Sequence, residues 1–152
     1  MYEQEYIQFL IDKYPDTYFT DIHKQYILPD YFAYLDEPAQ PNKTKVTYKD
    51  EIAFRRARFF ENIDFTNPDL IRTRLFSDRI YEYFRTHTTK NEMGWYATVD
   101  KVMDLAAEND EVRDHCLKYF INFFNTYGPK LIFQYVIENY YLDGSCGDLN
   151  IG

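Results

Sequence analysis

Apolar side chains recur at helical spacing along most of the 152 residues, and this period constrains the fold more than any other feature. The strongest example lies between Asp110 and Gly128-Pro129, which mark a helix start and a helix stop. Its apolar positions follow one face of a helix and are Val112, Cys116, Tyr119, Phe120, Phe123 and Tyr127. The period predicts an α-helical fold.

The same spacing predicts the other helices. A first helix, with Tyr2, Tyr6, Phe9 and Leu10 on one face, ends near Tyr14-Pro15. A short second helix, capped by Asp16 or Thr17 and carrying Phe19, Ile22 and Tyr26, closes before Pro29. Residues 36–46 contain two prolines and almost no apolar side chains, which predicts a loop. Residues 86–94 are expected to form a polar break that ends at Gly94. Four further helical stripes follow. The stripe that begins near residue 48 contains Ile52, Phe59 and Ile63, and the one near residue 70 contains Phe76, Ile80, Tyr83 and Phe84. The stripe near residue 95 contains Val99, Val102, Met103 and Ala106, and the one near residue 131 contains Ile132, Tyr135, Val136 and Tyr140.

Short connections between helices favour antiparallel neighbours. We therefore expect an all-α fold, an irregular antiparallel bundle or array of about six to seven helices. The length suits a single helical domain over residues 1–143, followed by a flexible tail or linker over residues 144–152. Neither a signal peptide nor a membrane-spanning run is recognisable in the chain.

Charge is distributed unevenly along the chain. The net charge of −8 argues against a nucleic-acid partner, because phosphate backbones attract positive surfaces. Residues 43–90 nevertheless hold eleven basic residues against seven acidic ones. Solvated helix faces with intrahelical ion pairs are one interpretation of this basic segment, and a docking surface for an acidic partner is the other.

No catalytic, cofactor-binding or metal-binding constellation stands out, so we expect the chain not to be an enzyme by itself. His115 lies beside Cys116, but adjacent helical residues point about 100° apart, and Cys116 belongs to the apolar stripe. Asp100 and Asp104 lie one helical turn apart without a histidine motif to complete a metal site, which predicts a solvated helix face. Two cysteines, Cys116 and Cys146, leave a disulfide between them open.

Three residues are candidates for ligand binding. Arg72 and Arg74 flank a bend after the helix start at Thr66-Asn67-Pro68-Asp69. Pairing with a carboxylate such as Asp64 or Asp69 is the structural interpretation of the arginines, and anchoring a ligand is the functional one. Trp95 supplies an aromatic wall, so an aromatic and arginine pocket for a small anion or glycan is one functional hypothesis.

The run F-F-x-N-I-D-F-x-N-x-x-L-I-R-T, from Phe59 to Thr73, resembles an α-helical domain of unknown function. That domain occurs in cell-envelope proteins of Gram-negative bacteria, commonly between a β-rich domain and a TlpA-like domain, a thiol–disulfide oxidoreductase with the thioredoxin fold. Weaker matches surround Tyr14-Pro15-Asp16-Thr17 and residues 138–142, so the resemblance covers residues 6 to 143.

The resemblance implies an exported protein, often a lipoprotein, in the periplasm or cell envelope, of which this chain is a middle domain. The redox cysteines would belong to the thioredoxin-like domain, and Cys146 lies beyond the matched region. The implied function is a non-catalytic accessory domain that positions or dimerises the thioredoxin-like domain, with that domain, an envelope protein or a second copy as partner. The small-ligand pocket is the alternative, and a hydrolase with carboxylates converging in a cleft is a third hypothesis.

Overall fold

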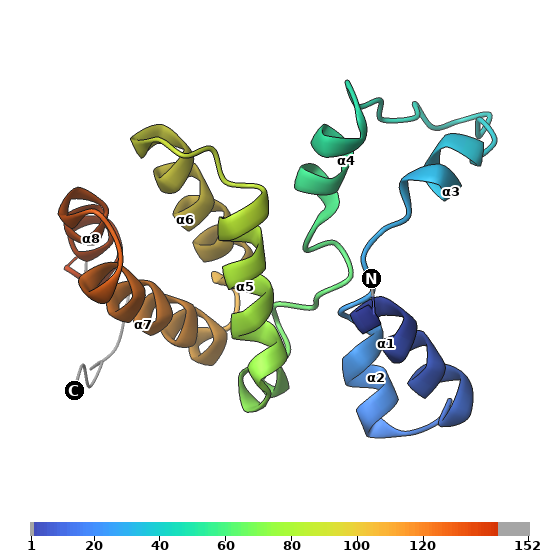
Figure 1. The fold of residues 1–152 in the computed structure, drawn as a ribbon, viewed down its shortest axis with the longest axis horizontal. Coiled ribbons are helices and arrows are strands. Elements are labelled where there is room, and N and C mark those ends of the chain that lie inside the picture. Colours follow the sequence, from blue (N-terminus) through green and yellow to red (C-terminus); the bar gives the residue numbers. More distant parts are fainter. Residues whose placement is uncertain (1, 143–152) are drawn as a thin grey trace. The chain divides into compact units, whose positions relative to one another are not determined.

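The computed structural model describes residues 2–142, and over this range the chain is all-α (Figure 1). Its elements are eight α-helices, one 3-10 helix and one π-helix, and the described residues contain no strand. The predicted all-α fold of about six to seven helices is confirmed. The chain divides into two compact units, residues 1–64 and 65–152. The single domain over residues 1–143 stays a prediction, and the predicted tail lies outside the described residues.

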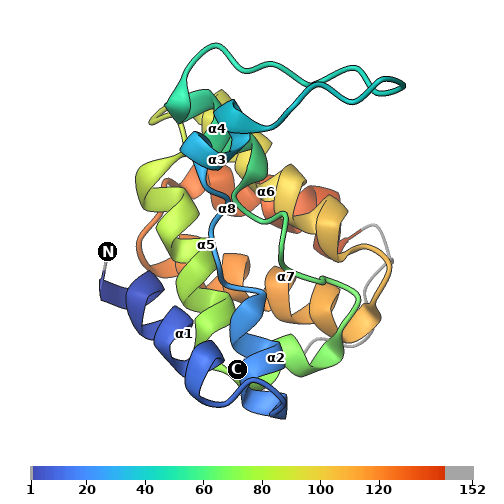
Figure 2. The ribbon, with the colours of Figure 1, turned by 90° about the vertical axis from the view of Figure 1, so that its right-hand side faces the viewer.

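The first unit begins with a helical hairpin of α1 (Tyr2–Lys13) and α2 (Tyr18–Lys24), which lie alongside each other (Figure 2). Thr17 caps α2, since its hydroxyl oxygen accepts a hydrogen bond from the Thr20 amide at 3.2 Å. Thr17 is therefore the cap of the two predicted for this helix. The side chain of Gln4 joins α1 to the chain after α2 by donating to the Tyr26 carbonyl oxygen, at 3.1 Å.

A second pair of helices, α3 (Tyr31–Asp36) and α4 (Glu51–Arg58), completes the first unit. The carboxylate of Asp30 caps α3 by accepting from the amides of the second and third residues after it, at 2.8 and 3.2 Å. The sequence did not predict α3, because six residues are too few to show a period. Phe54 is fully buried in this pair of helices, and its ring centroid lies within 5.4 Å of those of Tyr31, Tyr34 and Tyr48.

The predicted stripe of α4 is wrong in its register. Ile52 is 63% exposed, and the buried side chain of this helix is Phe54. Phe59 and Ile63 are buried but lie beyond the end of the helix at Arg58. The prediction extended one helical period over eight residues of helix and the turn after it, and the turn buries its aromatic side chains without keeping that period.

The second unit opens with η1 (Pro68–Arg72), a 3-10 helix, and α5 (Arg74–Thr86). Asn67 caps η1 by accepting from the Asp69 amide at 3.0 Å, and Pro68 occupies the first turn, as the start signal predicted. The predicted stripe of α5 is fully confirmed, since its four members are buried: Phe76, Ile80, Tyr83 and Phe84.

Helix α6 (Glu92–Ala106) begins earlier than predicted. The side chain of Asn91 caps it by accepting from the Gly94 amide at 2.8 Å, so Gly94 lies in the first helical turn instead of ending a break. A Cβ atom at Gly94 would lie 2.2 Å from the carbonyl oxygen of Thr89. The glycine is therefore required by a close backbone approach.

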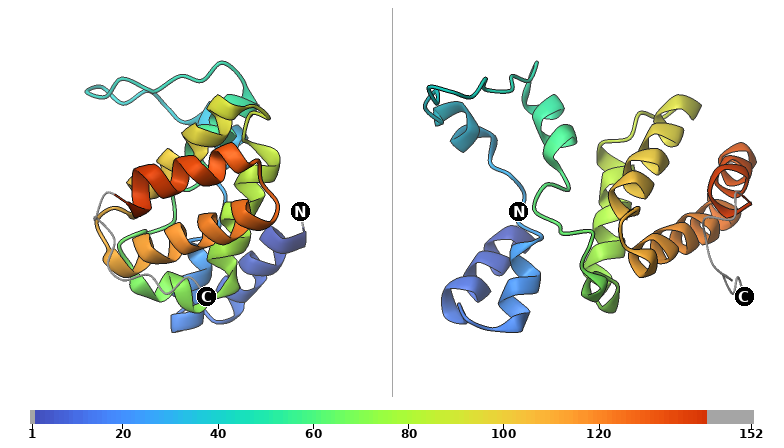
Figure 3. Two further views of the ribbon diagram at one scale, coloured as in Figure 1. Left: turned by 90° about the vertical axis from the view of Figure 1, so that its left-hand side faces the viewer. Right: turned by 180° about the vertical axis from the view of Figure 1, so that it is seen from behind.

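Helices α7 (Asp110–Thr126) and α8 (Lys130–Val136) run alongside each other, as the left-hand view of Figure 3 shows. Asn109 caps α7 through its side-chain oxygen, which accepts from the Val112 amide at 3.1 Å. The stripe predicted for α7 is buried at its first members but ends outside the core, because Tyr127 is 79% exposed. Phe120 and Phe124 of α7 pack with Phe84, at centroid distances of 5.7 and 5.6 Å.

A π-helix, η2 (Ile137–Tyr141), continues α8 and brings two tyrosines onto one carboxylate. Its wider turn is closed by the Leu142 amide, which donates to the Ile137 carbonyl oxygen at 2.9 Å. Because a π-helical turn aligns residues five apart better than an α-helical turn does, Tyr135 and Tyr140 both reach Asp100 of α6.

We call Asp100, Tyr135 and Tyr140 the tyrosine clasp. The hydroxyl of Tyr135 donates to both oxygens of the Asp100 carboxylate, at 2.7 and 2.8 Å, and the hydroxyl of Tyr140 donates to the same carboxylate. Tyr96 stacks on Tyr135 with 4.1 Å between ring centroids. The solvated face predicted for Asp100 is therefore wrong, because Tyr135 of α8 and Tyr140 of η2 cover this side of α6.

The clasp predicts a loss of stability in base. Burial and the hydrogen bond to Asp100 raise the pKa of Tyr135 from 10.0 to about 12, and the same causes raise the pKa of Tyr140. The folded state thus holds these protons more tightly than the unfolded state does, so the free energy of unfolding is unaffected below pH 10 and falls as the pH rises through 12. Circular dichroism during urea unfolding at several alkaline pH values measures this slope. Tyr135→Phe should make it shallower, and an unchanged slope would contradict the assignment.

Candidate ligand-binding pocket

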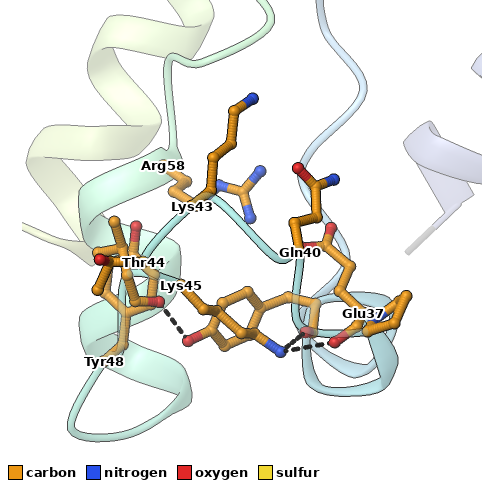
Figure 4. A pocket seen from close by; sticks show the side chains of 10 residues that line it. Glu37, Gln40, Lys43, Thr44, Lys45, Tyr48 and Arg58 are labelled. Carbon is orange, nitrogen blue, oxygen red and sulfur yellow. Dashed lines mark hydrogen bonds between the residues drawn. The ribbon is translucent and has the colours of Figure 1, made fainter.

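A hollow in the first unit lies between the C-terminal end of α3, the loop of residues 37–50 and α4 (Figure 4). Its volume is about 370 Å³. We call it the basic pocket. Its lining residues are Tyr34, Glu37, Pro38, Gln40, Lys43, Thr44, Lys45, Val46, Tyr48 and Arg58. The predicted loop of residues 36–46 supplies most of them, so the pocket is largely a product of this loop.

Two side chains tie the end of the loop to α3. The ammonium of Lys45 donates to the carbonyl oxygens of Tyr34 and Glu37, at 2.7 and 3.2 Å, and lies 4.6 Å from the centroid of the Tyr34 ring. A cation is favourable there because the last carbonyl groups of a helix lack intrahelical donors. The Tyr34 hydroxyl in turn donates to the Val46 carbonyl oxygen at 2.6 Å. These bonds hold residues 45 and 46 in place, and residues 38–44 form the outer wall of the pocket.

The basic excess of the middle of the chain falls in the stretch that contains this pocket. Residues 43–58 hold six basic residues against two acidic ones, whereas residues 59–90 hold five of each. The whole excess of the basic segment predicted from sequence therefore falls in the loop and α4. Among the lining residues, Lys43, Lys45 and Arg58 face one acidic residue, Glu37. In a chain of net charge −8, this pocket is a local site of positive potential.

Some of this charge is already paired. The guanidinium of Arg58 donates to both carboxylate oxygens of Glu61, one of them at 2.6 Å, and this hydrogen bonding raises the pKa of Arg58. Its ring partner is Phe54, at 5.0 Å from the centroid. Among residues 2–142, Lys43 has no carboxylate within ion-pair distance. Figure 4 shows Lys43 and Arg58 on one side of the pocket and Gln40 on the other.

The donors at the pocket are of the kinds that bind anions. Lys43 supplies a charged donor, Gln40 an amide and Thr44 a hydroxyl, and all three line the same hollow. Pro38, Val46 and Tyr48 add an apolar wall, and Val46 is 65% exposed. This arrangement can hold a carboxylate or phosphate group at the donors and an apolar body against the wall.

Three other arginines of the basic segment pair locally. Arg72, one of the predicted binding residues, has its Nε 3.1 Å from the Asp69 carboxylate, and this is the pairing that its structural interpretation predicted. Arg74 is 93% exposed, and its guanidinium lies 3.9 Å from Asp78. Arg55 pairs with Glu51, at 2.7 Å. Intrahelical ion pairs therefore account for much of the segment, as one of the two interpretations predicted.

Trp95 lies at a separate hollow of about 300 Å³ in the second unit, lined also by Pro129, Leu131 and Ile132. Its ring packs on Phe84, with 6.1 Å between the centroids. Neither predicted arginine lines this hollow, so the described residues do not combine the three predicted binding residues into one pocket. Aromatic and arginine side chains meet instead in the basic pocket, at Tyr48 and Arg58.

His115 and Cys116 have separate environments. The Nε2 atom of His115 lies 3.1 Å from the Ser77 hydroxyl, and burial together with nearby Lys118 lowers the pKa of this histidine. Cys116 is fully buried, and burial raises the pKa of its thiol. The predicted core position of Cys116 is confirmed, whereas Cys146 lies outside the described residues. Within residues 2–142, no three histidine, cysteine or carboxylate side chains come close enough to hold a metal ion.

We compared the chain with protein-family models, curated proteins and solved structures. None of them matches it. The resemblance to the envelope domain therefore stays a prediction. None of the helices in residues 2–142 has the length and apolar character needed to cross a membrane.

Proposed function

We propose that this chain is a binding module whose basic pocket takes the anionic group of a ligand. The observation that carries the proposal is a hollow of about 370 Å³ lined by three basic residues and one acidic residue, in a chain with net charge −8. An anion placed there gains charge-assisted hydrogen bonds from Lys43 and uncharged ones from Gln40 and Thr44. Lys45 acts as a positioning residue, because its ammonium is occupied by the carbonyl groups of α3.

The body of the ligand is expected to be apolar on one side. Pro38, Val46 and Tyr48 offer a wall that a small aromatic ring or the face of a sugar can cover. Glu37 supplies an acceptor for a ligand hydroxyl and repels a second anionic group. A monoanion with an aromatic or sugar body therefore fits better than a polyanion.

Charge reversal at Lys43 tests the pocket. Titration of the full chain with benzoate and with glucuronate, followed by NMR chemical shifts, should move the signals of residues 37–48. Lys43→Glu should lower the affinity for both ligands about tenfold, since it removes one charge-assisted hydrogen bond and adds charge repulsion. Lys49→Glu is the matched control, because it makes the same change at an exposed residue of the same loop that does not line the pocket.

Neutral counterparts complete this test. Benzyl alcohol and glucose keep the aromatic and sugar bodies but lack the carboxylate, and we expect them to bind at least tenfold more weakly than the acids. Equal binding of the acids and their neutral counterparts would overturn the proposal. Equal loss of affinity in Lys43→Glu and Lys49→Glu would overturn the assignment to this pocket.

The wider context that the resemblance implies is also proposed. The module would belong to an exported protein of the cell envelope, where it positions or dimerises a thioredoxin-like domain. The support is the run from Phe59 to Thr73. A complete reading frame with a signal peptide upstream and a C-x-x-C thioredoxin pattern downstream would agree with this context. Disulfide reductase activity of the present chain, lost on Cys146→Ser, would contradict a purely accessory role.

A further inference from the structure

The hairpin of α1 and α2 exposes an unusual amount of aromatic surface. Five aromatic side chains, which we call the hairpin surface, are between 46% and 63% exposed: Tyr6, Phe9, Tyr14, Tyr18 and Phe19. With roughly half of each ring accessible, they present on the order of 500 Å² of aromatic area. Aromatic side chains that stay this exposed are typical of interaction sites, because Tyr and Phe are enriched at protein interfaces.

Acidic residues accompany these rings. Five exposed carboxylates lie on the hairpin: Glu3, Glu5, Asp12, Asp16 and Asp21. Only Lys13 and Lys24 oppose them, and Lys24 lies 3.8 Å from Asp21. The hairpin therefore carries the opposite charge to the basic pocket and suits a different class of partner.

One contact within the hairpin shows what its rings can bind. The ammonium of Lys13 lies 5.5 Å from the centroid of Phe9 and 5.4 Å from that of Tyr14. Both rings thus accept a cation over their faces, in the geometry of a cation–π interaction. A lysine or arginine side chain of a partner would replace Lys13 over these rings and would meet the carboxylates around them.

We infer that the hairpin surface docks a protein segment that carries lysine or arginine beside apolar side chains, such as a basic amphipathic helix. Apolar side chains of the segment cover the rings, and its cations meet the exposed carboxylates of Glu5, Asp12 and Asp16. This inference concerns a partner distinct from the ligand of the basic pocket and does not depend on that ligand.

Two synthetic peptides of one amphipathic pattern test the inference, one built from leucine and lysine and the other from leucine and glutamate. Fluorescence anisotropy with the full chain should show the lysine peptide binding at least tenfold more tightly. Phe9→Ala should weaken that binding at least fivefold, and circular dichroism should show an intact fold, since Phe9 is 54% exposed. Tyr127→Ala removes an aromatic side chain that is 79% exposed in the second unit and should change nothing.

Three results would overturn the inference. Equal binding of the two peptides would remove the role of charge, and an equal effect of Phe9→Ala and Tyr127→Ala would remove the hairpin as the site. Self-association seen by analytical ultracentrifugation, abolished by Phe9→Ala, would assign the hairpin surface to a second copy of the chain. Lys43→Glu should leave peptide binding undiminished, which separates this result from any failure of the basic pocket.

Discussion

Phe54→Ala is expected to lower the free energy of unfolding of residues 1–64 by roughly 3–5 kcal/mol, the usual cost of emptying a buried phenylalanine site. Phe54 is fully buried, and its ring packs on Tyr31, Tyr34 and Tyr48. Two of these tyrosines line the basic pocket, so benzoate binding should be lost together with stability. Urea unfolding followed by circular dichroism, together with the benzoate titration, measures both effects.

A matched control lies on the same helix. Ile52 is 63% exposed, so Ile52→Ala should change the free energy of unfolding by no more than about 0.5 kcal/mol and leave benzoate binding intact. A larger loss of stability at Ile52 than at Phe54 would restore the register predicted from the sequence and contradict the packing of α3 against α4.

Asp100→Ala is expected to lower the free energy of unfolding of residues 65–142 by roughly 2–4 kcal/mol, because it removes a charged acceptor shared by two tyrosine hydroxyls. The hydroxyls of Tyr135 and Tyr140 both donate to this carboxylate and would be left without it in a partly buried site. The π-helix η2 should loosen with them. Hydrogen exchange of the amides in α8 and η2, measured beside urea unfolding, reports both effects.

Asp104→Ala is the control for this change. Asp104 lies one turn further along α6, carries the same charge and is exposed. Its removal should cost less than about 0.5 kcal/mol and leave exchange in η2 unchanged. If both variants lose the same stability, the loss comes from the charge on α6 and the tyrosine clasp contributes nothing of its own.

Much of the fold could be predicted because local rules decide it. The stripe of α5, the cap at Thr17 and the start signal around Pro68 depend on neighbours within one or two turns. The misses have non-local causes. Gly94 resembles a helix breaker in sequence, yet a carbonyl oxygen of residue 89 demands it. Ile52 follows the helical period, but tertiary packing selects Phe54.

The candidate site was only half visible in the sequence. The basic excess could be counted, but assigning it to residues 43–58 required seeing that Arg72 pairs with Asp69 and that Lys45 reaches back to α3. A pocket wall made by a loop has no period to detect. The Asp100 site was missed because it depends on η2, whose wider turn does not follow from residue type.

Trp95 gives this molecule a built-in optical probe. It is the one tryptophan of the chain, it lies in the second unit, and it packs on Phe84 and Phe124. Its fluorescence therefore follows the unfolding of residues 65–142 alone, while far-ultraviolet circular dichroism follows the helices of both units. Coincident transitions by the two signals would mean that the units unfold as one cooperative block, and separate transitions would give each unit its own stability.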